Sequence, residues 1–183
     1  RYVGDPVALV VAETKAQAAD AAEAVFIDID QLPAVTRAAD AVKPDAPQLW
    51  DATPGNVVLD FLHGDPDGVA KAFDEAAHTV VMDIDNNRVV VAAMEPRSAI
   101  ASYDAAADHY TLNIGCQGAF PMRNNIAGLL GVEREQVRVL IGNVGGSFGM
   151  KSAPYPEYVA IFAASKALGR PVKWLSLIHI DAA

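Results

Sequence analysis

The sequence contains a single cysteine, Cys116, and no apolar run approaching the ~20 residues that a membrane-spanning helix needs. One thiol cannot form a disulfide within the chain, and such sparing use of cysteine is typical of a reducing cytoplasm. Basic residues are also scarce: 14 lysines and arginines face 23 acidic residues, for a formal net charge of -9. This charge argues against nucleic acid or an anionic membrane as the main partner. We therefore expect a cytoplasmic protein with no membrane span and no nucleic-acid partner.

Hydrophobic residues are abundant enough to form a packed core. They make up 52% of the 183 residues, whereas charged residues make up 20%. This length corresponds to one large domain or two small ones. The sequence enters the apolar run Val7–Ala12 soon after Arg1, without an initiator methionine or a signal peptide. From this abrupt start we expect that the chain begins within a domain.

Local patterns predict a mixture of helices and strands. Residues 7–29 have the length and pattern of a strand–helix–strand unit, with Thr14 as the helix cap. The proline-rich stretch 31–56 predicts a long extended connection. Helices are expected at residues 15–24, 67–77, 123–130 and 156–168, and strands at residues 7–12, 25–29, 79–84, 89–92, 98–103, 110–114, 137–141 and from 172 onward.

The densest cluster of glycines follows the strand expected at residues 137–141. It reads Gly145-Gly146-Ser147-Phe148-Gly149-Met150-Lys151. Glycine backbones reach left-handed angles, so successive N–H groups here can line a concave site for an oxyanion or a metal-oxo group. A tight turn between a strand and a helix explains the spacing equally well. The segment has neither the GxxxxGK(S/T) spacing of a phosphate loop nor the GxGxxG spacing of a dinucleotide fold.

Two further segments carry candidate polar groups. Gln117, in Gly115-Cys116-Gln117-Gly118, follows an expected strand, and its amide can donate to an oxo ligand while accepting from a neighbour. A single glutamine in a turn is more often structural. Met94-Glu95-Pro96-Arg97, taken alone, is typical of a turn with a surface ion pair.

The order of these segments is more specific than any one of them. Along the chain come Arg1-Tyr2-Val3-Gly4-Asp5-Pro6-Val7-Ala8, Met94-Glu95-Pro96-Arg97, Cys116-Gln117-Gly118, Val144-Gly145-Gly146-Ser147-Phe148-Gly149-Met150-Lys151, Tyr155-Pro156-Glu157 and Gly169-Arg170-Pro171-Val172-Lys173-Trp174. This order resembles the large subunit of the xanthine dehydrogenase, aldehyde oxidase and aerobic carbon monoxide dehydrogenase family. The corresponding family segments include VGDPVA, MEPR or MEPH, TQGP and VGGGFGGK.

The resemblance implies an α+β fold in pieces of two domains. Residues 1–36 would be the C-terminal part of an α/β hammerhead domain and residues 37–58 a linker. Residues 59–174 would begin the molybdenum-cofactor-binding domain. Residues 175–183 are expected to be an artefactual tail, because Leu175-Ser176-Leu177-Ile178-His179-Ile180 resembles read-through of a sequencing adapter. No role is expected for His179.

The resemblance also implies a molybdenum–molybdopterin cofactor, in bacteria usually the cytosine dinucleotide form. Gln117 would hydrogen-bond the oxo group of the metal, and Gly118, Gly145, Gly146, Ser147, Phe148 and Gly149 would line the cofactor, while the pterin rather than the protein holds the molybdenum. The family oxidises carbon monoxide, aldehydes or N-heterocycles with water as the oxygen source. Electrons leave through an iron–sulfur small subunit with 2Fe-2S clusters and an FAD-binding medium subunit.

Some family residues are absent from this sequence. The catalytic glutamate of the family lies beyond it, so we expect no catalytic residue here and little or no activity from the chain alone. Ser152 stands where purine-oxidising members carry a glutamate, which argues against a xanthine-type substrate. Cys116 is expected to be a small packed side chain rather than a reactive thiol. The alternatives are a self-contained module that binds a small anionic molecule and a structural α+β module without a site.

Overall fold

The computed structural model describes residues 2, 4–87 and 89–176, and they form two compact units. One unit contains residues 26–87 together with residue 2. The other contains residues 4–25 and those from 89 onward, and it holds every segment with a candidate site residue. Most of the tail that is expected to be artefactual, residues 177–183 with His179, lies outside the described residues.

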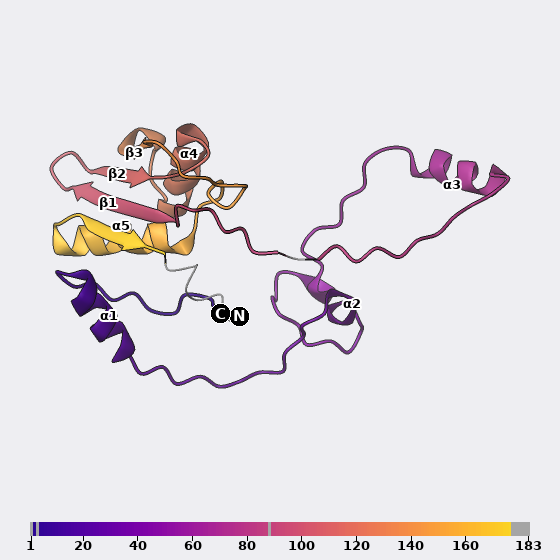
Figure 1. Cartoon of the computed structure of the whole chain (residues 1–183), viewed down its shortest axis with the longest axis horizontal. Helices are drawn as coiled ribbons and strands as arrows, with labels where there is room; N and C mark the ends of the chain where they lie inside the picture. Colours follow the sequence, from indigo (N-terminus) through magenta and orange to yellow (C-terminus); the bar gives the residue numbers. More distant parts are fainter. Residues whose placement is uncertain (1, 3, 88, 177–183) are drawn as a thin grey trace. The chain divides into compact units, whose positions relative to one another are not determined.

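The larger unit is built on a four-stranded sheet with the strand order β3-β2-β1-β4 (Figure 1). Strands β1 (Ser98–Asp104) and β2 (His109–Ile114), both predicted as strands, pair as an antiparallel hairpin. The carboxylate of Asp104 accepts hydrogen bonds from the N–H groups of Ala106 and Ala107 in its turn. Strand β3 (Val137–Leu140) runs parallel to β2, and β4 (Val172–Leu175) runs antiparallel to β1.

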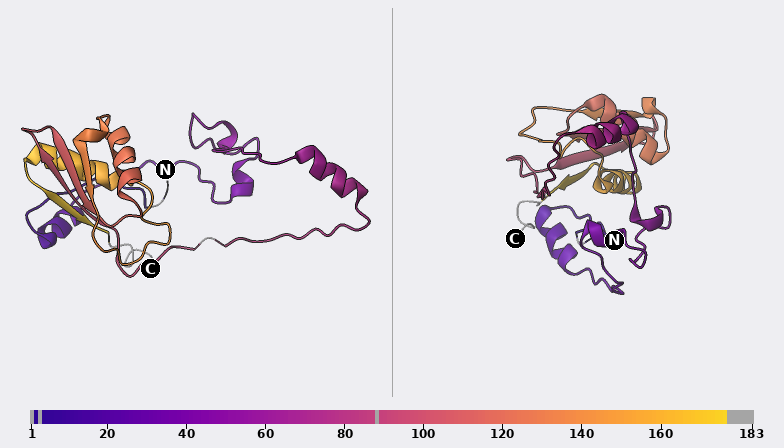
Figure 2. Two further views of the ribbon diagram at one scale, coloured as in Figure 1. Left: turned by 90° about the horizontal axis from the view of Figure 1, so that it is seen from above. Right: turned by 90° about the vertical axis from the view of Figure 1, so that its right-hand side faces the viewer.

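Two helices cover one face of this sheet (Figure 2). Helix α4 (Ala119–Leu130) connects β2 to β3, and α5 (Pro156–Leu168) precedes β4. Alternate strand residues such as Ala101 and Leu112 face the helices and are fully buried, as strand geometry requires. The helices contribute Met122, Ile126, Tyr158, Ile161 and Phe162 to the same core. Both helices end at the predicted residues, Leu130 and Leu168, and each is followed by a glycine with left-handed angles, Gly131 and Gly169.

Helix α1 (Lys15–Glu23) belongs to the larger unit as well. Thr14 caps it: its hydroxyl accepts from the N–H of Gln17, whose side-chain carbonyl accepts from the N–H of Thr14. This reciprocal arrangement satisfies two donors at the start of the helix. The predicted cap and helix are therefore confirmed.

The smaller unit contains α2 (Ala38–Ala41), the 3-10 helix η1 (Pro54–Asn56) and α3 (Pro66–Glu75). Asn56 ties α2 to η1, because its amide donates to the carbonyls of Ala41 and Pro47 and accepts from the N–H of Leu49. Part of the stretch predicted as an extended connection is thus folded into a hydrogen-bonded turn. None of the described residues of this unit is buried.

The predicted strands at residues 7–12, 25–29, 79–84 and 89–92 do not form among the described residues. These segments run extended without a hydrogen-bonded neighbour, and a strand exists only when it is paired. Helix α4 begins earlier than predicted, at Ala119. Pro121 is compatible with this start, because the first turn of a helix needs no N–H donor there.

Candidate functional site

The candidate residues gather at one end of the sheet because of its topology. Strand β1 begins at the end where β2 and β3 finish, since Ala99 pairs with Ile114 and Asn113 pairs with Leu140. The segment before β1, the turn after β2 and the glycine-rich loop after β3 therefore emerge together. The sequence separates these segments widely, and the sheet brings them into contact.

Gln117 and the glycine-rich loop are joined directly by hydrogen bonds. The hydroxyl of Ser147 donates to the side-chain carbonyl of Gln117 at 2.8 Å, and the same hydroxyl accepts from the N–H of Lys151 at 3.0 Å. The N–H of Gln117 donates to the carbonyl of Lys151 at 3.3 Å. Ser147 is buried beneath these contacts. The two motifs thus form one structural unit.

The tip of the loop presents unengaged N–H donors. Gly146, Phe148 and Gly149 have φ angles of 95°, 50° and 90°, so the backbone curves through left-handed conformations. A side chain on Gly146 would lie 3.3 Å from the Cβ atom of Ala93, which favours glycine there. Among the described residues, nothing accepts a hydrogen bond from the N–H groups of Gly146, Ser147, Phe148 or Gly149. Backbone curved in this way can bind a group rich in acceptors.

An ion pair closes the base of the loop. The ammonium of Lys151 lies 2.6 Å from the carboxylate of Glu95, and Lys151 is only 1% exposed. The same carboxylate oxygen accepts from the N–H of Gly145 at 2.8 Å. The hydrogen bonds from Lys151 and then from Gly145 lower the pKa of Glu95 below its ordinary value. Glu95 is therefore held as a carboxylate at neutral pH.

Arg97 forms a second ion pair close by in the sequence. It is 7% exposed, its guanidinium lies 3.3 Å from the carboxylate of Glu157, and it stacks 3.6 Å from the ring centroid of Tyr155. Its carbonyl accepts from the N–H of Ser176 at the end of β4. Taken alone, Met94–Arg97 suggests a turn with a surface ion pair; in the fold, Glu95 pairs with the buried Lys151 and Arg97 pairs with Glu157.

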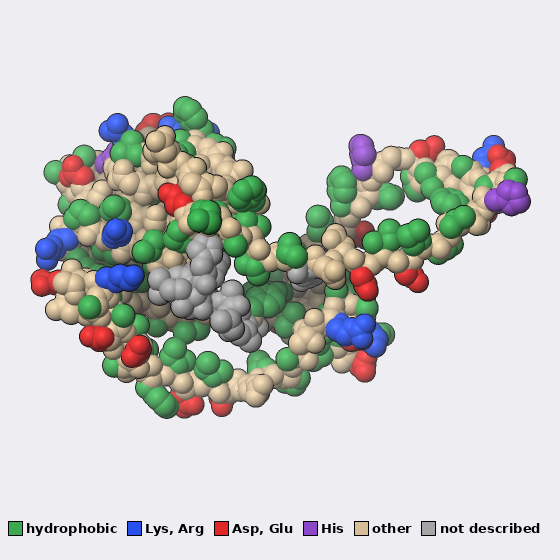
Figure 3. All heavy atoms as spheres, in the orientation of Figure 1, with side chains coloured by type: hydrophobic (Ala, Val, Ile, Leu, Met, Phe, Trp, Pro, Cys, Tyr) green, Lys and Arg blue, Asp and Glu red, His purple; other side chains and the backbone are tan. Residues whose placement is uncertain are grey.

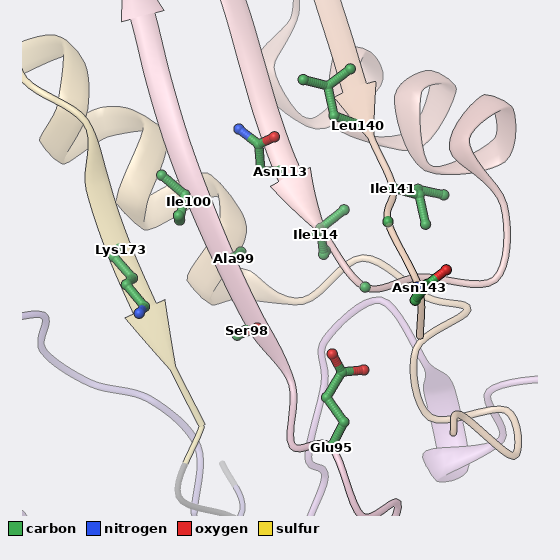
Figure 4. Close-up of a pocket in the computed structure, with 12 residues that line it drawn as sticks. Glu95, Ser98, Ala99, Ile100, Asn113, Ile114, Leu140, Ile141, Asn143 and Lys173 are labelled. Atoms are coloured by element: carbon green, nitrogen blue, oxygen red, sulfur yellow. The ribbon is translucent and has the colours of Figure 1, made fainter. Parts of the chain in front are cut away.

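An open hollow of about 420 Å³ lies on the sheet face that the helices leave uncovered. Figure 4 shows Glu95 rising from the segment before β1 toward the ends of β2 and β3. Ile100, Asn113 and Lys173 line the hollow from three strands. The hollow thus adjoins the base of the glycine-rich loop.

The remaining residues singled out in the sequence lie around the two motifs. Gly118 precedes the first turn of α4, and its carbonyl accepts from the N–H of Met122. Phe148 is 78% exposed, so its ring packs on none of the core. Cys116 is buried, as expected of a packed thiol. Ser152 is exposed, and its hydroxyl donates to the carbonyl of Gly149.

Sequence reasoning missed the partnership of Glu95 and Lys151. Both residues stand in the segments that carry the resemblance, but they are 56 positions apart and no spacing rule joins them. One signal was available in the sequence. Lys151 stands between a glycine-rich loop and an apolar helix, and a lysine that is buried in such a place needs a carboxylate partner. The partner itself could be identified only from the fold.

The curved donor loop and the adjoining glutamine therefore lie together at one end of the sheet. Comparison with known proteins shows which family this arrangement belongs to. Residues 49–179 match the family model of the molybdopterin cofactor-binding domain. The chain is 35% identical over 181 residues to the carbon monoxide dehydrogenase large chain of Hydrogenophaga pseudoflava, covering 92% of this chain and 22% of that relative. It is 33% identical to the nicotine 6-hydroxylase large subunit of Paenarthrobacter nicotinovorans, covering 96% and 21%.

A solved structure agrees in fold. Quinoline 2-oxidoreductase from Pseudomonas putida 86 matches with a TM-score of 0.76 and 30% identity, covering 90% of this chain and 21% of that one. The chain belongs to the molybdopterin-binding large-subunit family of the xanthine dehydrogenase type, and it spans about a fifth of the length of the curated relatives it matches. Within the described ranges, no helix has both the length and the hydrophobicity to cross a membrane.

Proposed function

We propose that Gln117 and the loop Gly145–Gly149 line the molybdenum–pterin cofactor of a molybdenum hydroxylase. The observation that carries this proposal is the 2.8 Å hydrogen bond from Ser147 to Gln117, which places the glutamine amide beside the curved loop. Gly118 and Ser147 support the two segments, and Phe148 and Gly149 offer backbone N–H groups. The metal itself would be held by the pterin dithiolene rather than by a protein side chain.

The donor set fits this group. Metal-oxo and phosphate oxygens accept hydrogen bonds, and the loop offers N–H donors without described acceptors. Gln117 contributes further N–H groups from its Nε2 atom, which has no acceptor in the described part of the chain. A bare metal cation would instead require carboxylate or carbonyl oxygens pointing inward. The cradle therefore suits an oxygen-rich cofactor, and the cytosine dinucleotide form is proposed because the family resemblance implies it.

The bound cofactor would supply the oxidation of a small substrate, either carbon monoxide, an aldehyde or an N-heterocycle, with oxygen from water. The residues of this chain would orient the cofactor, and fixed dipoles of this kind lower the cost of charge developing during reaction. No residue here is assigned as the catalytic base. An iron–sulfur subunit and an FAD subunit would accept the electrons, and the complex would work in the cytoplasm.

The domain organisation is part of the same proposal. Residues 1–36 would complete an α/β hammerhead domain elsewhere in the subunit, residues 37–58 would link, and residues 59–174 would begin the cofactor-binding domain. A self-contained anion-binding or structural module is not favoured, because the relatives match along nearly the whole chain yet are far longer.

The complete subunit, isolated with its partners, tests the assignment. The wild-type protein should contain molybdenum and pterin, and Gln117→Ala should lower substrate oxidation about 10–100-fold, as loss of a group that orients a metal cofactor does. Gln136→Ala is the matched control, since Gln136 bonds Asp108 at the opposite end of the sheet. A wild-type subunit without molybdenum, or a fully active Gln117→Ala variant, would contradict the proposal.

The chain Arg1–Ala183 alone should oxidise none of the three substrate classes. Oxidation needs a base and a pocket closed to water, and the hollow beside the loop is open. Turnover of carbon monoxide, an aldehyde or an N-heterocycle by this chain would overturn the expectation. The assay should supply an electron-accepting dye and follow its reduction, since each oxidation releases two electrons.

A further inference from the structure

The glycine-rich loop ends at a lysine that the fold has removed from water. Lys151 is 1% exposed, and the Glu95 carboxylate, 2.6 Å from its ammonium, is the sole ion-pair partner that the described residues offer it. A buried ammonium without a partner is strongly destabilising. Charge therefore forces Lys151 and Glu95 together, although the Glu95 side chain remains 38% exposed.

The same glutamate also holds the first residue of the loop. Its carboxylate accepts from the N–H of Gly145 at 2.8 Å, and its own N–H donates to the carbonyl of Gly145 at 3.1 Å. A Cβ atom on Gly145 would lie 2.6 Å from the Cβ atom of Glu95, so the two backbones approach as closely as glycine allows. Glu95 thus fastens both ends of the segment Gly145–Lys151.

This fastening reaches the side chain of Gln117. The hydroxyl of Ser147 accepts from the N–H of Lys151 and donates its single hydrogen to the carbonyl of Gln117. The carbonyl of Lys151 accepts from the N–H of Gln117. With its carbonyl oxygen engaged, Gln117 turns its NH₂ group away from Ser147. Lys151 thus contacts both the hydroxyl that bonds the Gln117 carbonyl and the Gln117 backbone.

We infer that Glu95 and Lys151 are positioning residues for the cofactor: their ion pair closes the loop Gly145–Lys151 and sets the orientation of the Gln117 amide. The inference rests on the proposed function of this loop. Neither residue is assigned a contact with substrate or with the metal. Their effect passes through Ser147 and the backbone.

The first test uses the full chain and needs no cofactor. Glu95→Gln and Lys151→Met each remove one charge at nearly constant size, and amide hydrogen exchange is read residue by residue by NMR. Exchange at Gly145 and Lys151 should accelerate about tenfold or more in both variants. Glu157→Gln is the control, because it breaks the Arg97–Glu157 pair and should leave these two amides at the wild-type rate.

The double variant Glu95→Gln/Lys151→Met separates positioning from stability. It leaves no unpaired charge in the interior, so its melting temperature should return toward that of the wild type. Its loop amides should nevertheless exchange as fast as those of the single variants. Loop amides that exchange no faster than in Glu157→Gln would overturn the inference.

The second test uses the complete subunit with its cofactor. Molybdenum retained after gel filtration should fall about tenfold or more in Glu95→Gln and in the double variant, relative to Glu157→Gln. Equal molybdenum in the wild type, Glu95→Gln and the double variant would overturn the positioning role while leaving the proposed function intact. A wild-type subunit without molybdenum would instead overturn the proposed function, and the two failures are therefore distinguishable.

Discussion

Glu95 makes the stability of the larger unit depend on pH. Hydrogen bonds from Lys151 and Gly145 lower the pKa of Glu95 in the folded chain from its ordinary value of 4.5. A lowered pKa contributes stability above the unfolded value, and this contribution is lost as the pH falls through the folded value. The melting temperature of the wild type should therefore exceed that of Glu95→Gln at about pH 7, and the gap should shrink steadily below about pH 4.5. Thermal melts across this range check the expectation, and a gap that persists unchanged at about pH 3 would contradict it.

Gly145 is required for lack of space rather than for its backbone angles. Alanine there would place its Cβ atom 2.6 Å from that of Glu95, and the overlap should cost about 1–3 kcal/mol in free energy of unfolding. Gly142 offers a matched control, because a Cβ atom there meets nothing within 4 Å. Gly142→Ala should change the same free energy by less than about 0.5 kcal/mol. Urea unfolding followed by circular dichroism measures the free energy of unfolding of both variants. Equal losses in Gly145→Ala and Gly142→Ala would contradict the steric argument.

Residues of the site differed in how far the sequence revealed them. Gln117 and the loop Gly145–Gly149 stand in recognisable motifs, and the structure joins them through Ser147. Their roles toward a cofactor stay predictions. The Glu95–Lys151 pair depends on the strand order that brings the start of β1 to the end of β3, which no local pattern encodes.

At the level of elements, the local signals that end helices proved sufficient. Helix α4 contains one interior glycine, Gly128, and ends at Gly131 with a φ angle of 67°. Gly128→Ala should stabilise the larger unit by about 0.5–1 kcal/mol, because alanine loses less conformational freedom and meets nothing within 4 Å. Gly131→Ala should destabilise it by about 1 kcal/mol, because alanine strains in the left-handed region. Denaturant midpoints should thus shift in opposite directions, and a shift in the same direction would refute the assignment of the cap.

Strands show the limit of local prediction. The hairpin β1–β2 was predictable because its turn chemistry at Asp104 is local. The apolar runs at residues 7–12 and 79–84 have the same composition as strands but lack a paired neighbour in the described chain. A helix satisfies its own hydrogen bonds, whereas a strand depends on residues elsewhere in the protein. The sequence pattern therefore reports what these segments can form, not what they pair with.

Across the whole molecule, apolar surface is divided unequally between the two units. The larger unit buries a core of strand and helix residues, whereas the smaller unit exposes large apolar side chains on both sides of α3 (Figure 3). Phe61 is 74% exposed and Val81 is 91% exposed. Large exposed apolar patches are typical of interaction surfaces. The relatives, of which this chain spans about a fifth, have the additional length to cover such a surface.

This division predicts a difference between the chain alone and the complete subunit. In the chain alone, amides at residues 58–62 and 79–84 should exchange close to the rate of an unfolded peptide, since no hydrogen-bonded ladder protects them. In the complete subunit the same amides should be protected about 100-fold or more, because pairing with other segments would supply the missing partners. Amides of β1 and β2 serve as the internal control and should be protected in both. Equal exchange at residues 79–84 in the two proteins would mean that the apolar surface stays uncovered, and the segment would then not be a strand of a larger sheet.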